Sequence, residues 1–202
     1  MRTRNGSYAE LVTVPAANVV LVRGATSTLG QAAVNVAVGE GATVIATTRK
    51  PERAALLRKV GAAEVLIDDG QLASQVRGLG REVDCVLDLV GNSVLRDSLR
   101  IVRSRGRVCQ LGFLGGLEPV DGFDPITDLP TGVQLSFYGS AFVLGTPGFP
   151  LADIPLQQML DKAANGLYQA KPARVFSFGQ IVEAHRTMED GVAAGKMVVS
   201  VS

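Results

Sequence analysis

Short apolar runs alternate with longer stretches rich in Ala and Leu from Asn18 onward. Five of these runs are nearly continuous in apolar residues, which is typical of strands buried on both faces. The predicted strands are Val19–Arg23, Thr43–Thr47, Glu64–Ile67, Asp84–Leu89 and Arg107–Gly112. The predicted helices between them are Leu29–Val38, Pro51–Val60, Leu72–Leu79 and Ser93–Val102. Because the connections are short, this alternation implies parallel strands with helices on both faces. The expected fold class is therefore α/β, a doubly wound parallel sheet of the Rossmann type.

The alternation loosens after Gly112. Gly115–Pro130 is rich in Gly, Pro and Asp and is predicted to be a loop. The elements expected beyond it are a strand at Gln134–Tyr138, a loop at Gly145–Pro150, a helix near Pro155–Asn165, a strand at Arg174–Phe178, a helix at Gln180–Asp190 and a strand at Lys196–Val201.

Composition narrows the class of protein. The chain has 202 residues, of which 47% are hydrophobic and 19% charged, so it can bury a core without disulfides or a structural metal. A net charge of +1 and the lack of Trp argue against nucleic acid and anionic membrane as partners. No apolar stretch is long enough to span a bilayer. Cys85 and Cys109 lie in apolar runs and are expected to be buried thiols in a reducing compartment, which predicts a cytoplasmic protein.

The segment VLVRGATSTLG, from Val20 to Gly30, joins a buried strand to a helix through a turn of Gly, Ser and Thr. The first N–H groups of a helix lack intrahelical partners, and together with the helix dipole they attract a pyrophosphate. In the G-x-G-x-x-G pattern the glycine positions fall on Ala25, Ser27 and Gly30. Gly30 allows close packing of helix on strand, whereas Ser27 places a side chain where the backbone should approach the phosphates. Its hydroxyl could itself donate to a phosphate. An ordinary strand-to-helix turn is the alternative interpretation.

The end of the second strand bears on the choice of cofactor. Enzymes that use NAD place Asp or Glu there to hold the ribose 2′-hydroxyl. This strand ends in Thr48-Arg49-Lys50, with Arg53 one turn later. A guanidinium can bind a 2′-phosphate through two hydrogen bonds, so the sequence favours NADPH over NADH. The alternative is a solvated start of a helix.

These segments occur in order with DCVLDLVGN from Asp84, GRVCQLGFLGG from Gly106 and the tail IVEAHRTMEDGVAAGKMVVSV from Ile181. Together they resemble the medium-chain dehydrogenase/reductase superfamily, in its zinc-less quinone oxidoreductase and enoyl reductase branch. The resemblance implies an NADPH-dependent oxidoreductase that reduces quinones or activated alkenes such as enones by hydride transfer. A non-catalytic nucleotide-binding remnant, or a subunit that needs a partner for activity, stays open as the alternative. A short-chain dehydrogenase is disfavoured because no Tyr has a Lys at the Tyr-x-x-x-Lys spacing.

The resemblance also implies cofactor contacts at matching positions. The residues concerned are Ala25, Thr26, Ser27, Thr28, Leu29 and Gly30 at the pyrophosphate, Thr48, Arg49 and Arg53 at the 2′-phosphate, Val90 and Gly91 at the ribose and nicotinamide, Leu111, Gly112 and Phe113 at the nicotinamide ring, and Lys196 near the cofactor. Lys196 is equally interpretable as a surface lysine. No catalytic residue or metal site is predicted, since His185 is expected to be packed and Asp88 to be a hydrogen-bonded structural carboxylate.

Members of this superfamily carry an N-terminal barrel-like substrate domain, of which we recognise the trailing edge at Gly6–Pro15. We expect residues 1–18 to be a remnant of that domain and 19–178 to be the dinucleotide-binding domain. Residues 179–202 would form a helix and a strand that return to the substrate-domain side. Members commonly pair through an edge strand of the cofactor sheet, so a homodimer is expected through Gln134–Tyr138, with Ala141–Leu144 beyond it.

Overall fold

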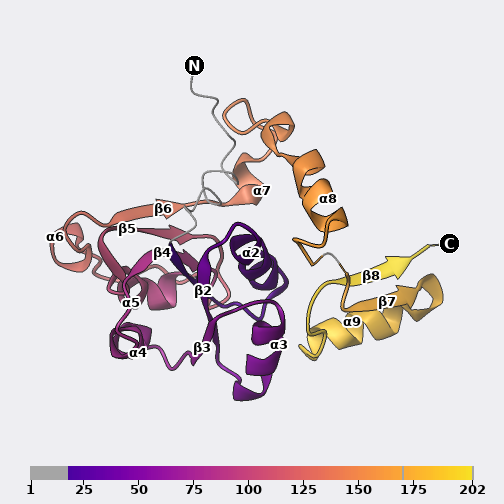
Figure 1. The fold of residues 1–202 in the computed structure, drawn as a ribbon, viewed down its shortest axis with the longest axis horizontal. Helices are drawn as coiled ribbons and strands as arrows, with labels where there is room; N and C mark the ends of the chain where they lie inside the picture. Colours follow the sequence, from indigo (N-terminus) through magenta and orange to yellow (C-terminus); the bar gives the residue numbers. More distant parts are fainter. Residues whose placement is uncertain (1–17, 170, 202) are drawn as a thin grey trace.

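The computed structural model describes residues 18–169 and 171–201. The predicted substrate-domain remnant at residues 1–18 lies, except for Asn18, outside the described residues. The described chain forms a six-stranded sheet with helices on both faces, and a two-stranded sheet that lies to one side of it (Figure 1). The strand order of the large sheet is β3-β2-β1-β4-β5-β6, and every neighbouring pair is parallel. The predicted doubly wound α/β class is confirmed.

The observed elements follow the predicted ones closely. The strands of the large sheet are β1 (Val19–Arg23), β2 (Thr43–Thr48), β3 (Glu64–Ile67), β4 (Val83–Asp88), β5 (Val102–Gln110) and β6 (Gln134–Phe137), and those of the small sheet are β7 (Arg174–Ser177) and β8 (Met197–Ser200). The α-helices are α2 (Thr28–Gly39), α3 (Ala54–Lys59), α4 (Leu72–Gly78), α5 (Leu95–Leu99), α6 (Pro125–Asp128), α7 (Ser140–Val143), α8 (Leu156–Ala164) and α9 (Ile181–Glu189). Short 3₁₀ turns occur at Pro51–Arg53, Asn92–Val94, Leu151–Asp153 and Phe178–Gln180.

The largest difference in boundaries arises because the chain makes an irregular excursion inside β5. The fifth strand begins at Val102 rather than at Arg107, and the helix before it ends at Leu99. Between these two parts of the strand, Arg105 adopts a φ of 62°, and the ladder with β4 resumes at Arg107. Two further differences are short helices. The helix α6 lies within the segment Gly115–Pro130 that was predicted to be a loop, and α7 forms in the segment expected beyond the sixth strand.

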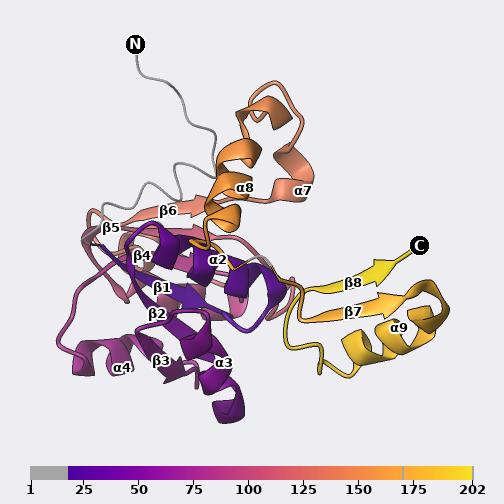
Figure 2. The ribbon, with the colours of Figure 1, turned by 45° about the vertical axis from the view of Figure 1, so that its right-hand side comes forward.

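The two faces of the large sheet carry separate hydrophobic clusters. Helices α2 and α3 cover one face, and α4 and α5 cover the other (Figures 1 and 2). Along β1, Val20 and Val22 point to the first face and Leu21 to the second, as the alternation of a strand requires. Cys109 is buried in the first cluster and the partly buried Cys85 packs against it. Burial raises the pKa of the Cys85 thiol to about 12, so it is neutral at physiological pH.

The last elements form their own small unit. Strands β7 and β8 are parallel, and α9 connects them and packs on them through the buried Ala184 and Thr187. His185 lies on the exposed side of α9, so the expectation that it is packed is wrong. None of the helices in the described part of the chain is long and apolar enough to cross a membrane.

A polar cluster ties α8 to the end of α2. The ammonium group of Lys162 and the hydroxyl of Tyr168 both donate to the Glu40 carboxylate. Burial acts to raise the pKa of Glu40, but these two hydrogen bonds outweigh it and lower the pKa. The contact joins α8 and the segment after it to the face covered by α2.

Candidate functional site

The strand order places a topological switch point between β1 and β4. These strands are neighbours in space, yet the chain leaves β1 towards β2 and leaves β4 towards β5, in opposite directions. In open α/β sheets the crevice at the carboxyl ends of such strands is the usual ligand site. Arg23 ends β1 and lies beside Asp88, which ends β4. The candidate site is therefore the carboxyl edge of the sheet around these two residues.

The turn after β1 is built on two glycines. Gly24 has a φ of 80°, a conformation that suits glycine, and its carbonyl accepts a hydrogen bond of 3.2 Å from the Ser27 amide. A Cβ atom on Gly30 would lie 2.5 Å from the Gly24 carbonyl oxygen and 2.6 Å from the Ala25 Cα. Gly30 therefore lets α2 pack directly on the turn, as its position in the pattern predicts. The first glycine of the G-x-G-x-x-G pattern makes the tight turn, and its position falls on Ala25. In this structure the turn is made one residue earlier, at Gly24.

Ser27 is the N-cap of α2. Its Oγ accepts a hydrogen bond of 3.0 Å from the Gly30 amide, while its carbonyl accepts one from the Gln31 amide. Asn, Asp, Ser and Thr are the side chains that cap helices best, which explains why serine is tolerated here. The side chain is turned back onto the helix, although its hydroxyl hydrogen can still be donated.

The start of α2 remains suited to an anion. Thr28 and Leu29 are the first two residues of this 12-residue helix, and both are exposed. Their amides precede the first intrahelical hydrogen bond and lie at the positive end of the helix dipole. The carbonyl of Thr26 accepts from the Gln31 side chain at 3.0 Å, which holds the turn from behind. The turn and the helix start thus fit a phosphate group.

Three predicted cofactor residues follow β2. Thr48 is buried, and its hydroxyl exchanges hydrogen bonds with the backbone of Lys50, accepting from the amide at 3.0 Å and donating to the carbonyl at 3.2 Å. The Arg53 guanidinium donates to the carbonyl of Gly191, in the loop between α9 and β8. Arg49 is exposed at the carboxyl edge. Arg49 is therefore the cation of this set that lies open to solvent.

The loops after β4 and β5 lie against each other. The Val90 and Gly91 amides each donate to Asp88 Oδ1 at 2.8 Å, and a Cβ atom on Gly91 would lie 2.5 Å from the Gly112 carbonyl oxygen. Asp88 is thus the hydrogen-bonded structural carboxylate that the sequence predicts.

The loop after β5 continues the same edge. The Leu111 amide donates to the Asp88 carbonyl at 2.7 Å, and the Phe113 ring lies 5.6 Å from the Phe137 ring. The structure therefore brings Leu111, Gly112 and Phe113 together with Val90 and Gly91.

Lys196 directly precedes β8 of the small sheet and lies on the side of the molecule where α2 begins. The Ala194 carbonyl, two residues earlier, accepts a hydrogen bond of 3.3 Å from Gln31 on α2. The Lys196 side chain is exposed, and its carbonyl accepts from the Ala173 amide at 2.8 Å. The loop before β8 thus lies beside the start of α2, and Lys196 follows this loop.

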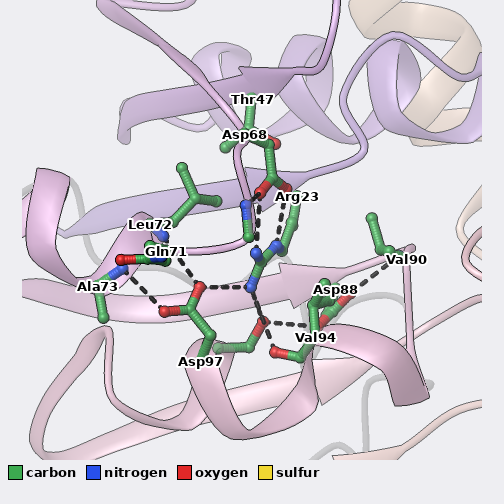
Figure 3. A network of polar contacts seen from close by, with 12 residues as sticks. Arg23, Thr47, Asp68, Gln71, Leu72, Ala73, Asp88, Val90, Val94 and Asp97 are labelled. Atoms are coloured by element: carbon green, nitrogen blue, oxygen red, sulfur yellow. Dashed lines mark hydrogen bonds and ion pairs between the residues drawn. The ribbon is translucent and has the colours of Figure 1, made fainter.

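A buried charged network lies directly at the switch point and was not predicted. We name it the Arg23 cluster: Arg23, Asp68, Asp88, Asp97 and Ser98 (Figure 3). The Arg23 side chain is fully buried and binds Asp68 through Nε and Nη2 at 2.8 and 2.9 Å. Its Nη1 lies 2.8 Å from Asp97 Oδ2 and 3.0 Å from Ser98 Oγ. The Ser98 hydroxyl in turn donates to Asp88 Oδ2 at 2.6 Å. The sequence signals for this network were Arg23 and Asp88, the charged residues that end two largely apolar strands.

The cluster carries one positive charge and three carboxyl groups. Burial acts to lower the pKa of Arg23, but the hydrogen bond and charge of Asp68, together with the other carboxylates, raise it. Burial raises the pKa of Asp88 even though Ser98, the Gly91 amide and Arg23 favour its charged form. Removing Arg23 would therefore leave a group of buried carboxylates without a counter-charge.

Backbone amides also donate hydrogen bonds to two of these carboxylates. The amides of Leu72 and Ala73, at the start of α4, donate to Asp97 at 3.1 and 3.2 Å, and the Gly70 amide donates to Asp68 at 3.0 Å. In the described ranges no three His, Cys, Asp or Glu side chains gather in a way that would hold a metal ion.

Comparison with known proteins identifies the family of this chain. Residues 28–153 match the family described as zinc-binding dehydrogenase. Among curated proteins, a reducing polyketide synthase of Floropilus chiversii is 30% identical over 188 residues, which are 90% of this chain and 8% of that protein. The phthioceranic/hydroxyphthioceranic acid synthase of Mycobacterium tuberculosis is 28% identical over 197 residues, which are 95% of this chain and 9% of that protein. The chain thus spans less than a tenth of the length of these relatives.

Solved structures share the fold. A quinone oxidoreductase of Pseudomonas syringae pv. Tomato superposes with a TM-score of 0.76 and 22% identity, covering 94% of this chain and 58% of that one. A 2-haloacrylate reductase gives 0.74 and 25%, covering 88% and 55%. A mycobacterial protein complexed with NADPH gives 0.73 and 24%, covering 91% and 58%.

Proposed function

Since this chain belongs to the zinc-binding dehydrogenase family, within the medium-chain dehydrogenase/reductase superfamily, we propose that it binds NADPH at the carboxyl edge of β1, β2 and β4. The start of α2 would hold the pyrophosphate through the amides of Thr28 and Leu29. Arg49 would bind the 2′-phosphate. The loops at Val90–Gly91 and Leu111–Phe113 would line the nicotinamide side, and Lys196 would approach from the loop before β8.

The observation that carries this proposal is the position of the α2 N-terminus at the switch point, with an exposed arginine after β2. An anion-binding helix start and a cation beside the ribose position are the two features that NADPH requires. A protein of the same fold is complexed with NADPH, which supports the choice of cofactor. Although the family description names zinc, the described residues do not fit a zinc ion, so we assign no step to one.

The reaction that we propose is the reduction of quinones or of activated alkenes such as enones. The chemistry that NADPH supplies in such a site is hydride donation to an electrophilic carbon. This chain's own residues would bind and orient the cofactor and shape the wall around it. The names of structural relatives, a quinone oxidoreductase and a 2-haloacrylate reductase, support this substrate class.

Calorimetric titration with NADPH and NADH tests the cofactor assignment. Replacing Arg49 with Ser should weaken NADPH binding roughly 10- to 100-fold, because a charge-assisted hydrogen bond contributes about 1.5–3 kcal/mol. NADH has no 2′-phosphate, so its affinity should stay the same. Arg58→Ser is the matched control, because Arg58 is also an exposed arginine but lies in α3. This variant should change the affinity for neither cofactor. An equal loss for both cofactors would show that Arg49 does not read the 2′-phosphate.

Turnover is measured separately, as NADPH oxidation in the presence of a simple quinone or enone. Oxidation above a buffer control supports the oxidoreductase proposal for this chain. Tight NADPH binding without oxidation would favour the alternative, a nucleotide-binding subunit that needs a partner for activity. Absence of binding to either cofactor would contradict the proposal itself.

We further propose that two copies pair through β6. This strand is one of the two edges of the large sheet, and its Leu135 and Phe137 side chains are exposed. An exposed apolar edge is a template for pairing with a second copy. Replacing Leu135 with Asp is expected to convert a dimer to a monomer in light scattering. Leu160→Asp, at an exposed leucine on α8, should leave the mass unchanged, and a monomeric native chain would refute the proposal.

A further inference from the structure

The Arg23 cluster lies at the place where the proposed cofactor crosses the sheet. Arg23 and Asp88 end the two strands that flank the switch point, and their Cα atoms are partners in the β1–β4 register. The Arg23 side chain extends to the face covered by α4 and α5, where it meets Asp97 (Figure 3). Asp97 and Ser98 both belong to α5. Asp68 follows β3, two strands away. The cluster thus joins the carboxyl ends of three strands at one edge of the sheet.

A directed chain of hydrogen bonds leads from this cluster to the loop after β4. Arg23 Nη1 donates to Ser98 Oγ at 3.0 Å, and the Ser98 hydroxyl donates to Asp88 Oδ2 at 2.6 Å. The other carboxylate oxygen of Asp88 accepts from the amides of Val90 and Gly91, both at 2.8 Å. Because Arg can only donate, the Ser98 hydrogen is directed to Asp88, and the carboxylate plane is fixed.

The loop held in this way packs closely against the loop after β5. Gly91 has a φ of 89°, and a Cβ atom on it would lie 2.5 Å from the Gly112 carbonyl oxygen. The Leu114 and Gly115 amides donate to the carbonyls of Leu89 and Val90 at 3.0 and 2.9 Å. A change in the orientation of Asp88 would therefore pass from the loop after β4 to the loop after β5.

We propose that Ser98 and Asp88 are positioning residues for the dinucleotide. Arg23 donates to Ser98 and so orients its hydroxyl towards Asp88. The two residues thereby fix the position of the Val90–Gly91 loop, and this position determines how tightly the nicotinamide half of NADPH is bound. This inference rests on the proposed function, since it assigns that loop to the cofactor. Neither residue touches the cofactor, and both act through the two backbone amides.

The test interrupts this series of hydrogen bonds at two residues, by substitutions that keep the buried charge of Arg23. Ser98→Ala removes the hydroxyl, and Asp88→Asn keeps an oxygen for the two amides but replaces the oxygen that accepts from Ser98. Ser74→Ala, on the neighbouring helix α4, is the matched control, because the exposed Ser74 hydroxyl contacts only the Gln71 carbonyl at 3.1 Å among the described contacts. Melting temperature, NADPH affinity well below the melting temperature and backbone ¹⁵N–¹H resonances are measured for each variant.

We expect both cluster variants to weaken NADPH binding roughly five- to tenfold, the equivalent of one hydrogen bond, while the control does not. In the cofactor-free proteins the Val90 and Gly91 amide resonances should shift, and those of Thr28 and Leu29 should not. If wild type binds NADPH and the variants bind it equally well with only lower melting temperatures, the cluster is merely structural and the inference is overturned. Shifted resonances with unchanged affinity would also overturn it. Failure of wild type to bind NADPH is a different result, which contradicts the proposed function.

Discussion

Replacing Arg23 with Met is expected to lower the free energy of unfolding by about 3–5 kcal/mol, the usual cost of removing one partner of a buried ion pair. The Met side chain replaces only the aliphatic part of the arginine and leaves Asp68 and Asp97 without the guanidinium that lies 2.8 Å from each. The Asp68 and Asp97 side chains are only 8% and 19% exposed, so water can replace the lost donors only in part. Urea unfolding followed by circular dichroism measures the change.

A second ion pair supplies the control for this prediction. Arg103 binds Asp84 at 2.6 Å, but the arginine side chain is 38% exposed. Arg103→Met should therefore cost no more than about 1 kcal/mol, because exposed pairs are screened by solvent. Adding Asp68→Asn and Asp97→Asn to Arg23→Met should recover part of the loss by removing the unpaired charges. Equal losses at Arg23 and Arg103 would contradict the role of burial.

Replacing Gly30 with Ala is expected to abolish most NADPH binding. The new Cβ would meet the Gly24 carbonyl oxygen and the Ala25 Cα, both backbone atoms that cannot rotate away. The start of α2 would have to move, and Thr28 and Leu29 would move with it. Loss of two hydrogen bonds to a charged phosphate, at about 1.5–3 kcal/mol each, corresponds to an affinity loss of about 100-fold or more. Calorimetry measures the affinity.

The same substitution on another helix separates this effect from helix propensity. Gly78 ends α4, and a Cβ atom there would meet no atom within 4 Å. Gly78→Ala should leave NADPH binding unchanged and stabilise the fold slightly, by up to about 1 kcal/mol. Unchanged NADPH affinity in Gly30→Ala would show that the cofactor is not held by the α2 start.

Much of the fold is readable from local patterns. The runs at β1 and β3 match the observed strands residue for residue, because β-branched and other apolar residues concentrate in each strand between polar or Gly-containing turns. Gly30 was identified from its place in a turn motif, whose geometry depends on neighbouring backbone alone. Predicted boundaries differ most from the observed ones where the chain is irregular, as at Arg105 within β5.

The side-chain partners of the site depend on contacts between distant segments. Arg23 meets Asp68 and Asp97, which are 45 and 74 positions away in the chain, so no local pattern could pair them. Likewise, Arg53 was predicted at the cofactor, and the structure shows it donating to Gly191. His185, expected to be packed, is exposed because α9 buries a narrow stripe at Ala184 and Thr187.

The amino-acid sequence by itself determined the order of strands and helices, the helix start after β1 and the cations after β2, because periodicity and turn chemistry act between near neighbours. The tertiary structure alone decided that β1 and β4 lie side by side, that Arg23 joins the carboxyl ends of three strands, and that Ser27 caps a helix instead of facing outward. Those outcomes depend on how the helices and strands pack against one another. The free energy of this packing comes from contacts between residues far apart in the sequence, which no local pattern contains.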